Sequence, residues 1–215
     1  MKYPLIVSNT TLWTKGASLF QRICRDMGCE EEYLQDLTKK EEDDILSTYV
    51  QRHKGVTRGS IERFAGVVSL QEGTTEFFRD LHKRFDAEGM KLVLLTSDYQ
   101  ELASLFQRQL GFSYALGSRA QYDKDVHAGF LDGMTYNCVR PRKIEEICIR
   151  EGLTLKNVLC LGSSVNDIPI LASIYYEKGF SIQVGENPSL RRFSDVTYTP
   201  KKSFEGLLEH IIKNQ

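Results

Sequence analysis

Three polar segments of this chain each follow a short apolar run. Ser8–Thr11 follows YPLIV, Thr96–Asp98 follows KLVLL, and Gly162–Asp167 follows NVLCL. The segments carry hydroxyl, amide and carboxylate groups, which bind ligands through hydrogen bonds and charge. If the apolar runs are parallel strands of one sheet, the segments meet at its carboxyl edge, where α/β sheets place their binding sites. The sequence therefore predicts one ligand site built from three distant segments.

The runs before these segments have the composition of buried strands. Residues 3–7, 91–96 and 157–162 are short and mostly apolar, which is typical of strands covered on both faces. Between them, apolar residues recur at helical spacing, as in the series Phe77, Phe78, Leu81 and Phe85. The alternation predicts an α/β fold with a Rossmann-like parallel sheet, in which residues 3–7 form the central strand.

One long stretch lacks this alternation. No strand-like run occurs from residue 14 until about Val67, whereas Leu19, Phe20, Ile23 and Cys24 recur at helical spacing. We therefore expect a helical cap at residues 14–72, inserted into an α/β core made of residues 1–13 and 73–215.

The composition excludes several partners. Lys and Arg number 28 against 29 Asp and Glu, so the chain lacks the basic footprint of a nucleic-acid-binding protein. No window approaches the ~18 apolar residues of a membrane span, and the first apolar stretch is too short for a signal peptide. We expect a cytoplasmic protein that binds neither nucleic acid nor membranes.

Cysteine usage agrees with a reducing compartment. The five cysteines form no CxxC pair and lie far from any cluster of histidines; they are Cys24, Cys29, Cys138, Cys148 and Cys160. The pattern predicts reduced, mostly buried thiols and no zinc site.

The order of these segments resembles the haloacid dehalogenase superfamily. LLTSDYQELASLFQRQLGF is similar to its second motif, RPRKIEEI to its third and LCLGSSVNDIPIL to its fourth. The stretch VHAGFLDGM and the place of the helical insert resemble the phosphoserine-phosphatase branch. The resemblance covers essentially the whole chain and implies a haloacid-dehalogenase-like core that carries a helical cap.

The first and fourth motifs depart from the family pattern, Asp-x-Asp-x-Thr and Gly-Asp-x-x-x-Asp. If Thr11 matches the threonine, Val7 replaces the nucleophilic aspartate and Asn9 the acid/base aspartate. Ser163 replaces a metal-binding aspartate, which leaves Asp167 as the remaining candidate metal ligand. The family transfers a phosphoryl group through an aspartyl-phosphate, which requires a nucleophile, a proton-exchanging group and bound magnesium. Valine, asparagine and serine supply none of these.

The resemblance assigns the retained residues to phosphate binding. It implies that Thr96, Ser97 and Lys143 hold phosphoryl oxygens and that Thr11 supports the loop beside them. With carboxylates and metal both lost, Lys143 and Asp167 can neutralise each other. An anion can then compete with Asp167 for the lysine without any metal.

Simpler interpretations of the same residues remain open. Lys143 could face solvent, Asp167 could merely cap the helix that follows it, and Thr96 and Ser97 could cap theirs. Val7 could be only a core residue.

The sequence thus leads to two functions. The first is a catalytically impaired phosphatase, or pseudophosphatase, that binds a small phosphorylated molecule or a protein partner and needs no cofactor. The alternative is a working hydrolase of small phosphomonoesters, dependent on Mg²⁺, with a non-standard active site. In that case Ser8 could serve as the nucleophile, or Asp98 could replace a lost carboxylate.

Overall fold

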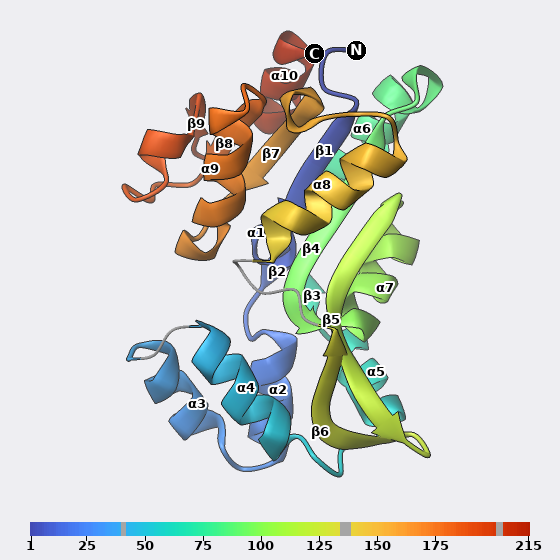
Figure 1. Ribbon diagram of the computed structural model, residues 1–215, viewed down its shortest axis with the longest axis vertical. Helices are drawn as coiled ribbons and strands as arrows, with labels where there is room; N and C mark the ends of the chain where they lie inside the picture. Colours follow the sequence, from blue (N-terminus) through green and yellow to red (C-terminus); the bar gives the residue numbers. More distant parts are fainter. Residues whose placement is uncertain (40–41, 134–138, 201–203) are drawn as a thin grey trace.

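A computed structural model of the chain describes residues 1–39, 42–133, 139–200 and 204–215. In these residues seven strands form one sheet in the order β6-β5-β4-β1-β7-β8-β9, with β1 at its centre (Figure 1). The strands are β1 (Leu5–Asn9), β4 (Lys91–Tyr99), β5 (Tyr114–Asp123), β6 (Val126–Gly133), β7 (Val158–Gly162), β8 (Phe180–Val184) and β9 (Val196–Tyr198). Strand β1 pairs in parallel with both β4 and β7. The predicted α/β fold with a central first strand is confirmed.

Helices cover both faces of the sheet. Helices α6 (Thr74–Phe85), α7 (Gln100–Leu110) and α10 (Glu205–Asn214) pack on one face, against the side chains of Ile6, Leu92 and Leu94. Helices α8 (Arg140–Arg150) and α9 (Ile168–Tyr176) pack on the other, against Leu5, Val7 and Val93. Since β1 and β4 alternate between these two cores, both strands must be apolar along most of their length.

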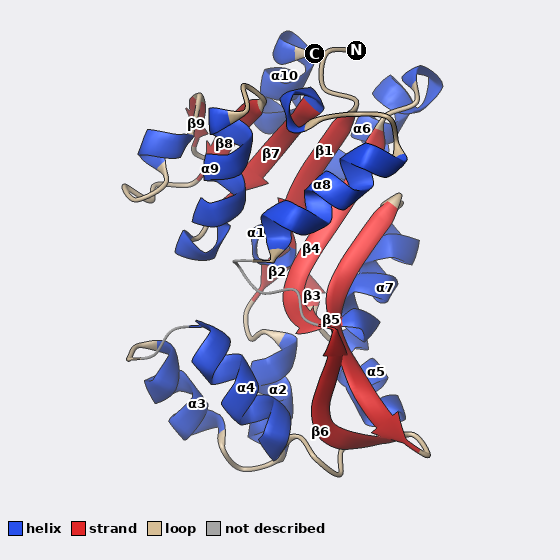
Figure 2. Ribbon diagram, in the orientation of Figure 1, coloured by secondary structure: helices blue, strands red, loops and turns tan. Residues whose placement is uncertain are grey.

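A second group of helices lies at one end of the sheet (Figure 2). The helices are α2 (Leu19–Asp26), α3 (Glu30–Leu37), α4 (Glu42–Arg52) and α5 (Arg58–Gly66). They lie between two short strands, β2 (Thr14–Lys15) and β3 (Ser69–Leu70), which pair with each other in antiparallel fashion. We refer to α2–α5 as the cap helices; the proposed boundaries of the cap at residues 14 and 72 stay a prediction.

The hairpin formed by β5 and β6 differs from the purely parallel sheet that was expected. Strand β5 spans ten residues, and β6 pairs with it in antiparallel fashion. Most of VHAGFLDGM forms β6, while its last residue, Met134, lies outside the described residues. The hairpin reaches the cap helices, where the Gly55 N–H donates to the His127 carbonyl at 3.0 Å and the Arg58 N–H to the Asp125 carbonyl at 2.8 Å. Main-chain hydrogen bonds therefore tie the cap to the sheet.

The remaining elements are short. They are the helix α1 (Thr10–Trp13) and the 3₁₀ turns η1 (Asp86–Glu88), η2 (Leu155–Asn157), η3 (Val165–Asp167) and η4 (Arg191–Phe193). None of the helices in the described part of the chain has the length and apolar character that a membrane span requires.

Candidate functional site

Side chains from three strand ends touch one another at the carboxyl edge of the sheet. The Asn9 amide at the end of β1 donates a hydrogen bond to the Asp167 carboxylate, which follows β7. The Thr10 hydroxyl donates to the Thr96 hydroxyl of β4 at 2.8 Å, and the Thr11 hydroxyl lies 3.4 Å from that of Ser163. The structure therefore brings the three predicted segments together. We call this group of residues the strand-end cluster.

Asp167 is the centre of the strand-end cluster and is almost completely buried. Its Oδ2 accepts hydrogen bonds from the Ser163 N–H at 2.8 Å, the Ser164 N–H at 2.9 Å and the Ser164 hydroxyl at 3.2 Å. Its Oδ1 accepts from the Asn9 amide and lies 3.5 Å from Nη1 of Arg140. Asp167 precedes α9 but makes no side-chain hydrogen bond to that helix. The carboxylate therefore closes the turn before it, and both of its oxygens are occupied.

The cation beside Asp167 is Arg140, so the expected pair of Lys143 with Asp167 is wrong. The Arg140 side chain is only 4% exposed, and its Nη1 also donates to the Asn166 carbonyl at 3.1 Å. The Lys143 side chain is 38% exposed, and its Nζ lies 3.0 Å from Oε2 of Glu146. Lys143 lies three residues, about 4.5 Å, further along the axis of α8, where its ammonium pairs with Glu146 on the next turn.

A signal for Arg140 is present in the sequence. Pro141 occupies the first turn of α8, the position where proline marks a helix start. The helix therefore begins at Arg140, three residues before Lys143, and its first side chain faces the end of β7.

Asn9 fits this cluster as an amide rather than as a carboxylate. Its Oδ1 accepts from the Leu12 N–H at 3.2 Å and from the Thr11 hydroxyl, so it caps α1. Its Nδ2 donates to Asp167. An ionised aspartate accepts hydrogen bonds only and could not make the second contact. Residue 9 thus joins two strand ends by donating and accepting at once.

Val7, at the family position of the nucleophile, and its neighbour Ser8 have structural roles. Val7 is 1% exposed, pairs with Val93 and Cys160, and packs in the apolar core beneath α8 and α9. The hydroxyl of Ser8 accepts a hydrogen bond from Nε1 of Trp13 at 2.9 Å, and Ser8 is itself buried. The sequence interpretation of Val7 as a core residue therefore agrees with its packing.

Thr96 and its neighbours connect the strand-end cluster to the cap. The Thr96 hydroxyl accepts from the Asp98 N–H at 3.1 Å as well as from Thr10. Oδ1 of Asp98 accepts from the Phe20 N–H at 3.1 Å, at the start of α2. The residue that precedes α7 is Tyr99, which makes no side-chain cap; Ser97 is half-buried.

Metal ligands are sparse in this arrangement. No group of three or more His, Cys, Asp and Glu side chains in the described ranges could hold a metal ion. At the strand ends, the candidate donors are the amide of Asn9, the hydroxyl of Ser163 and the carboxylate of Asp167.

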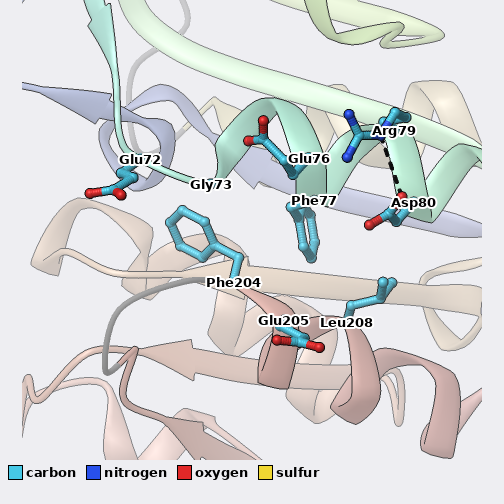
Figure 3. A pocket seen from close by; sticks show the side chains of 9 residues that line it. All are labelled: Glu72, Gly73, Glu76, Phe77, Arg79, Asp80, Phe204, Glu205 and Leu208. Atoms are coloured by element: carbon cyan, nitrogen blue, oxygen red, sulfur yellow. Dashed lines mark ion pairs between the residues drawn. The ribbon is translucent and has the colours of Figure 1, made fainter.

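A separate pocket of about 470 Å³ lies between α6 and α10 (Figure 3). Carboxylates surround two phenylalanine rings there, and the guanidinium of Arg79 lies 3.5 Å from Asp80. The lining residues are Glu72, Gly73, Glu76, Phe77, Arg79, Asp80, Phe204, Glu205 and Leu208. None of them belongs to the strand-end cluster, so the pocket is a distinct groove between two helices.

Comparison with known families identifies the class of protein that has this fold and site. The family model of haloacid dehalogenase-like hydrolases matches residues 8–172. The chain therefore belongs to the haloacid dehalogenase-like hydrolase family.

The relatives point to the phosphoserine-phosphatase branch of that family. The phosphoserine phosphatase of Methanocaldococcus jannaschii is 22% identical over 196 residues, which are 88% of each chain. That of Archaeoglobus fulgidus is 26% identical over 125 residues, which are 58% of this chain but 35% of the relative. The chain thus spans about a third of the length of that relative, and the match to the Streptococcus thermophilus enzyme covers 57% of it.

Solved structures share the whole architecture. A substrate-bound phosphoserine phosphatase complex superimposes with a TM-score of 0.80 at 21% identity, covering 98% of this chain and 99% of that one. A phospho-aspartyl intermediate analogue of phosphoserine phosphatase gives a TM-score of 0.79 at 20% identity, with the same coverage. The expected membership in the phosphoserine-phosphatase-like branch is confirmed.

Proposed function

We propose that this phosphoserine-phosphatase-like chain binds a small phosphorylated molecule but does not hydrolyse it. The observation that carries the proposal is the state of Asp167, the one family carboxylate retained. Both of its oxygens are held by Asn9, Arg140 and the turn at Ser163 and Ser164. The centre that would transfer a phosphoryl group is replaced by a hydrogen-bonded cluster whose charges cancel.

The side chains at the strand ends do not supply the steps of the reaction. Val7 has no nucleophilic atom and packs in the core. The amide of Asn9 cannot exchange a proton near neutral pH, so neither protonation of a leaving group nor activation of water is available there. Ser8 is the nearest hydroxyl in β1, and it is buried and bonded to Trp13. A rate loss on the order of 10⁴–10⁶ is expected from the missing nucleophile alone.

Magnesium does not fit this donor set. The ion requires near-octahedral oxygen coordination and usually one or two carboxylates to offset its dehydration. Binding at Asp167 would require breaking its contacts with Asn9 or with the turn at Ser163 and Ser164. We therefore propose a protein that works without a metal cofactor.

Groups suited to an anion remain at the edge of the cluster. Thr11 is exposed, Ser97 and Ser163 are half-buried, and Arg140 contributes the positive charge. Hydroxyls and a guanidinium are effective partners of a phosphate group. In this proposal an anion competes with Asp167 for the buried Arg140, the part that the resemblance gave to Lys143, while Thr96 holds the segment that carries Thr11.

A turnover assay tests the absence of catalysis. The native protein is incubated with a panel of phosphomonoesters that includes phosphoserine, with and without magnesium, beside a Val7→Asp/Asn9→Asp/Ser163→Asp triple variant. We expect no turnover by the native protein and none by each single variant, because the three groups act as one unit. Magnesium-dependent activity in the triple variant alone would show that the rest of the site is intact. Robust native turnover that is lost in Asp167→Asn would overturn the proposal in favour of a working hydrolase.

A binding measurement tests the retained function. Calorimetry with phosphoserine and with inorganic phosphate is expected to give the same affinity with and without magnesium. Thr11→Val and Ser163→Ala should each weaken that binding several-fold, whereas Lys143→Ala should leave it nearly unchanged. Absence of binding for the whole panel, or equal affinity in all three variants, would rule out an anion site at the strand ends.

A further inference from the structure

The end of helix α2 brings two cysteines together. The Cys29 N–H donates to the Cys24 carbonyl at 2.8 Å, and the Gly28 N–H donates to the Arg25 carbonyl at 3.1 Å. Gly28 has a φ of 72°, in the left-handed region. This pair of hydrogen bonds defines a Schellman motif, which frequently brings the side chains at the positions of Cys24 and Cys29 together.

The two thiols are neighbours and differ in exposure. Burial raises the pKa of the Cys24 thiol, and the nearby Cys29 thiol raises it further. Cys24 is completely buried, Cys29 is half-buried, and both are free thiols. A disulfide requires Cα atoms roughly 4.4–6.8 Å apart and facing Cβ atoms, and the main-chain hydrogen bond from Cys29 to Cys24 brings the two backbones together. The pair therefore needs little backbone movement to become covalent.

A polar group lies beside the buried thiol. On the buried side, Sγ of Cys24 lies 3.5 Å from Nε2 of His53. Burial lowers the pKa of His53 to about 3, so its ring is neutral and resists protonation. The hydroxyl of Tyr99 holds the other ring nitrogen at 2.7 Å.

We propose that Cys24 and Cys29 form a reversible dithiol–disulfide pair, in which a peroxide oxidises Cys29 and Cys24 then resolves it. The sulfur of Cys29 attacks one peroxide oxygen, the O–O bond breaks, and a sulfenic acid and one water form. The sulfur of Cys24 displaces the hydroxyl group from that sulfur, and its proton leaves with this hydroxyl as a second water. Two thiols and one hydrogen peroxide thus give one disulfide and two waters.

Two other cysteines provide internal controls. Cys148 and Cys160 are buried in the apolar core beneath α8 and α9, and burial raises the pKa of the Cys148 thiol to about 11. Thiols of this kind react slowly with oxidants. Burial raises the pKa of the Cys24 thiol as well, which is why the half-buried Cys29 is the thiol that reacts with peroxide first. Cys138 lies outside the described residues and can compete as a partner, so the test must identify which cysteines are joined.

A tryptic digest can report the disulfide directly, because Arg25 lies between the two cysteines. Trypsin cleaves after Arg22, Arg25 and Lys39, which separates residues 23–25 from residues 26–39. After treatment of the native protein with hydrogen peroxide, we expect these two peptides to remain joined in a non-reduced digest. Dithiothreitol should separate them and restore both free thiols.

Single cysteine-to-serine variants test which thiols form the disulfide. Cys29→Ser should abolish the linked peptide, Cys148→Ser should leave it unchanged, and Cys24→Ser should leave Cys29 as a sulfenic acid that dimedone traps. If Cys24→Ser does not fold, the half-buried Cys29→Ser carries the test. Equal alkylation of Cys24 and Cys29 before and after peroxide, or a disulfide from Cys29 to Cys138 instead, would overturn the proposal. It is independent of the function proposed for the strand ends.

Discussion

The strand-end cluster and the junction between cap and sheet bury polar side chains in different ways. In the strand-end cluster, opposite charges meet, since Asp167 and Arg140 are each almost fully buried and lie 3.5 Å apart. At the junction, two histidines are buried as neutral rings. His53 of the cap and His127 of β6 are 0% and 1% exposed.

The junction is held by aromatic and imidazole contacts. His53 lies against Tyr99, whose ring also stacks on Phe20 with centroids 4.7 Å apart. Nδ1 of His127 accepts from the Gly129 N–H at 2.8 Å. Burial, with a smaller effect of His127, lowers the pKa of His53 to about 3, and burial lowers that of His127 to about 4. Both rings stay uncharged at neutral pH.

The difference indicates how each region can fail. The strand-end cluster depends on having both partners of a buried charge pair, because one buried ion alone is very unfavourable. The junction depends on pH, because its histidines must lose a proton to be buried. Mutation should therefore damage the first region most, and acid the second.

The largest expected effect is the loss of Arg140. Arg140→Ala leaves the Asp167 carboxylate buried without its cation, and removal of one partner of a buried pair costs about 3–5 kcal/mol. Urea unfolding at pH 7 should show this loss in the free energy of unfolding. Lys143→Ala, on the same helix, is the matched control. Its ammonium is 38% exposed and pairs with Glu146 at the surface, so the change should stay within about 0.5 kcal/mol. If both variants lost the same free energy of unfolding, Arg140 would not be the cation that stabilises the buried Asp167.

Acidification should give the second effect. The unfolded-state pKa of histidine is about 6.5, above the values of about 3 and about 4 in the folded protein. The unfolded chain therefore binds more protons between these limits, so the contribution of the neutral rings is fully present above pH 6.5 and decreases below it. By pH 5 the loss should reach up to about 2 kcal/mol per imidazole.

Urea unfolding at pH 7, 6 and 5 measures this slope. The double variant His53→Gln/His127→Gln is expected to have a flatter pH dependence across this window, whatever its stability at pH 7. A slope equal to that of the native protein would show that the buried imidazoles are not its source.

The third prediction concerns the pH dependence of stability when a second carboxylate is placed in the strand-end cluster. Asn9→Asp replaces the amide that donates to Asp167 with a second carboxylate. Two adjacent buried carboxylates cannot both ionise easily, so the variant should be about 2 kcal/mol less stable than native at pH 7. At pH 5 a shared proton should restore the hydrogen bond and reduce the difference. A difference between variant and native that grows on acidification would contradict this account.

Sequence patterns predict the fold well and the contacts of the site only in part. The central strand is predictable because a short apolar run has few alternatives. The hairpin is not, because its turn uses Lys124 and Asp125 with φ of 47° and 68°, without the glycine that usually marks such turns. Asn9 and Asp167 are predictable as neighbours because parallel strand ends meet. The contact of Arg140 with Asp167 is not predictable in this way. Several basic residues lie in the first turn of α8, and the rotation of the helix about its axis decides which of them points toward the sheet. The junction of His53 and His127 carries no local signal, since its two halves lie on different elements.

The smallest expected effect concerns a single hydroxyl at the junction. Tyr99→Phe removes the O–H that lies 2.7 Å from Nδ1 of His53 but keeps the ring that stacks on Phe20. Because one buried neutral hydrogen bond is lost and little packing changes, the free energy of unfolding should fall by about 1 kcal/mol. Tyr122→Phe is the matched comparison: its hydroxyl donates to Oε1 of Glu101 at 2.7 Å, and removal of a donor to a carboxylate should cost more, about 1.5–3 kcal/mol. A larger loss in the free energy of unfolding for Tyr99→Phe than for Tyr122→Phe would mean that the His53 imidazole depends strongly on its hydrogen-bond partner, as Asp167 depends on Arg140. The two regions would then not differ in the way described above.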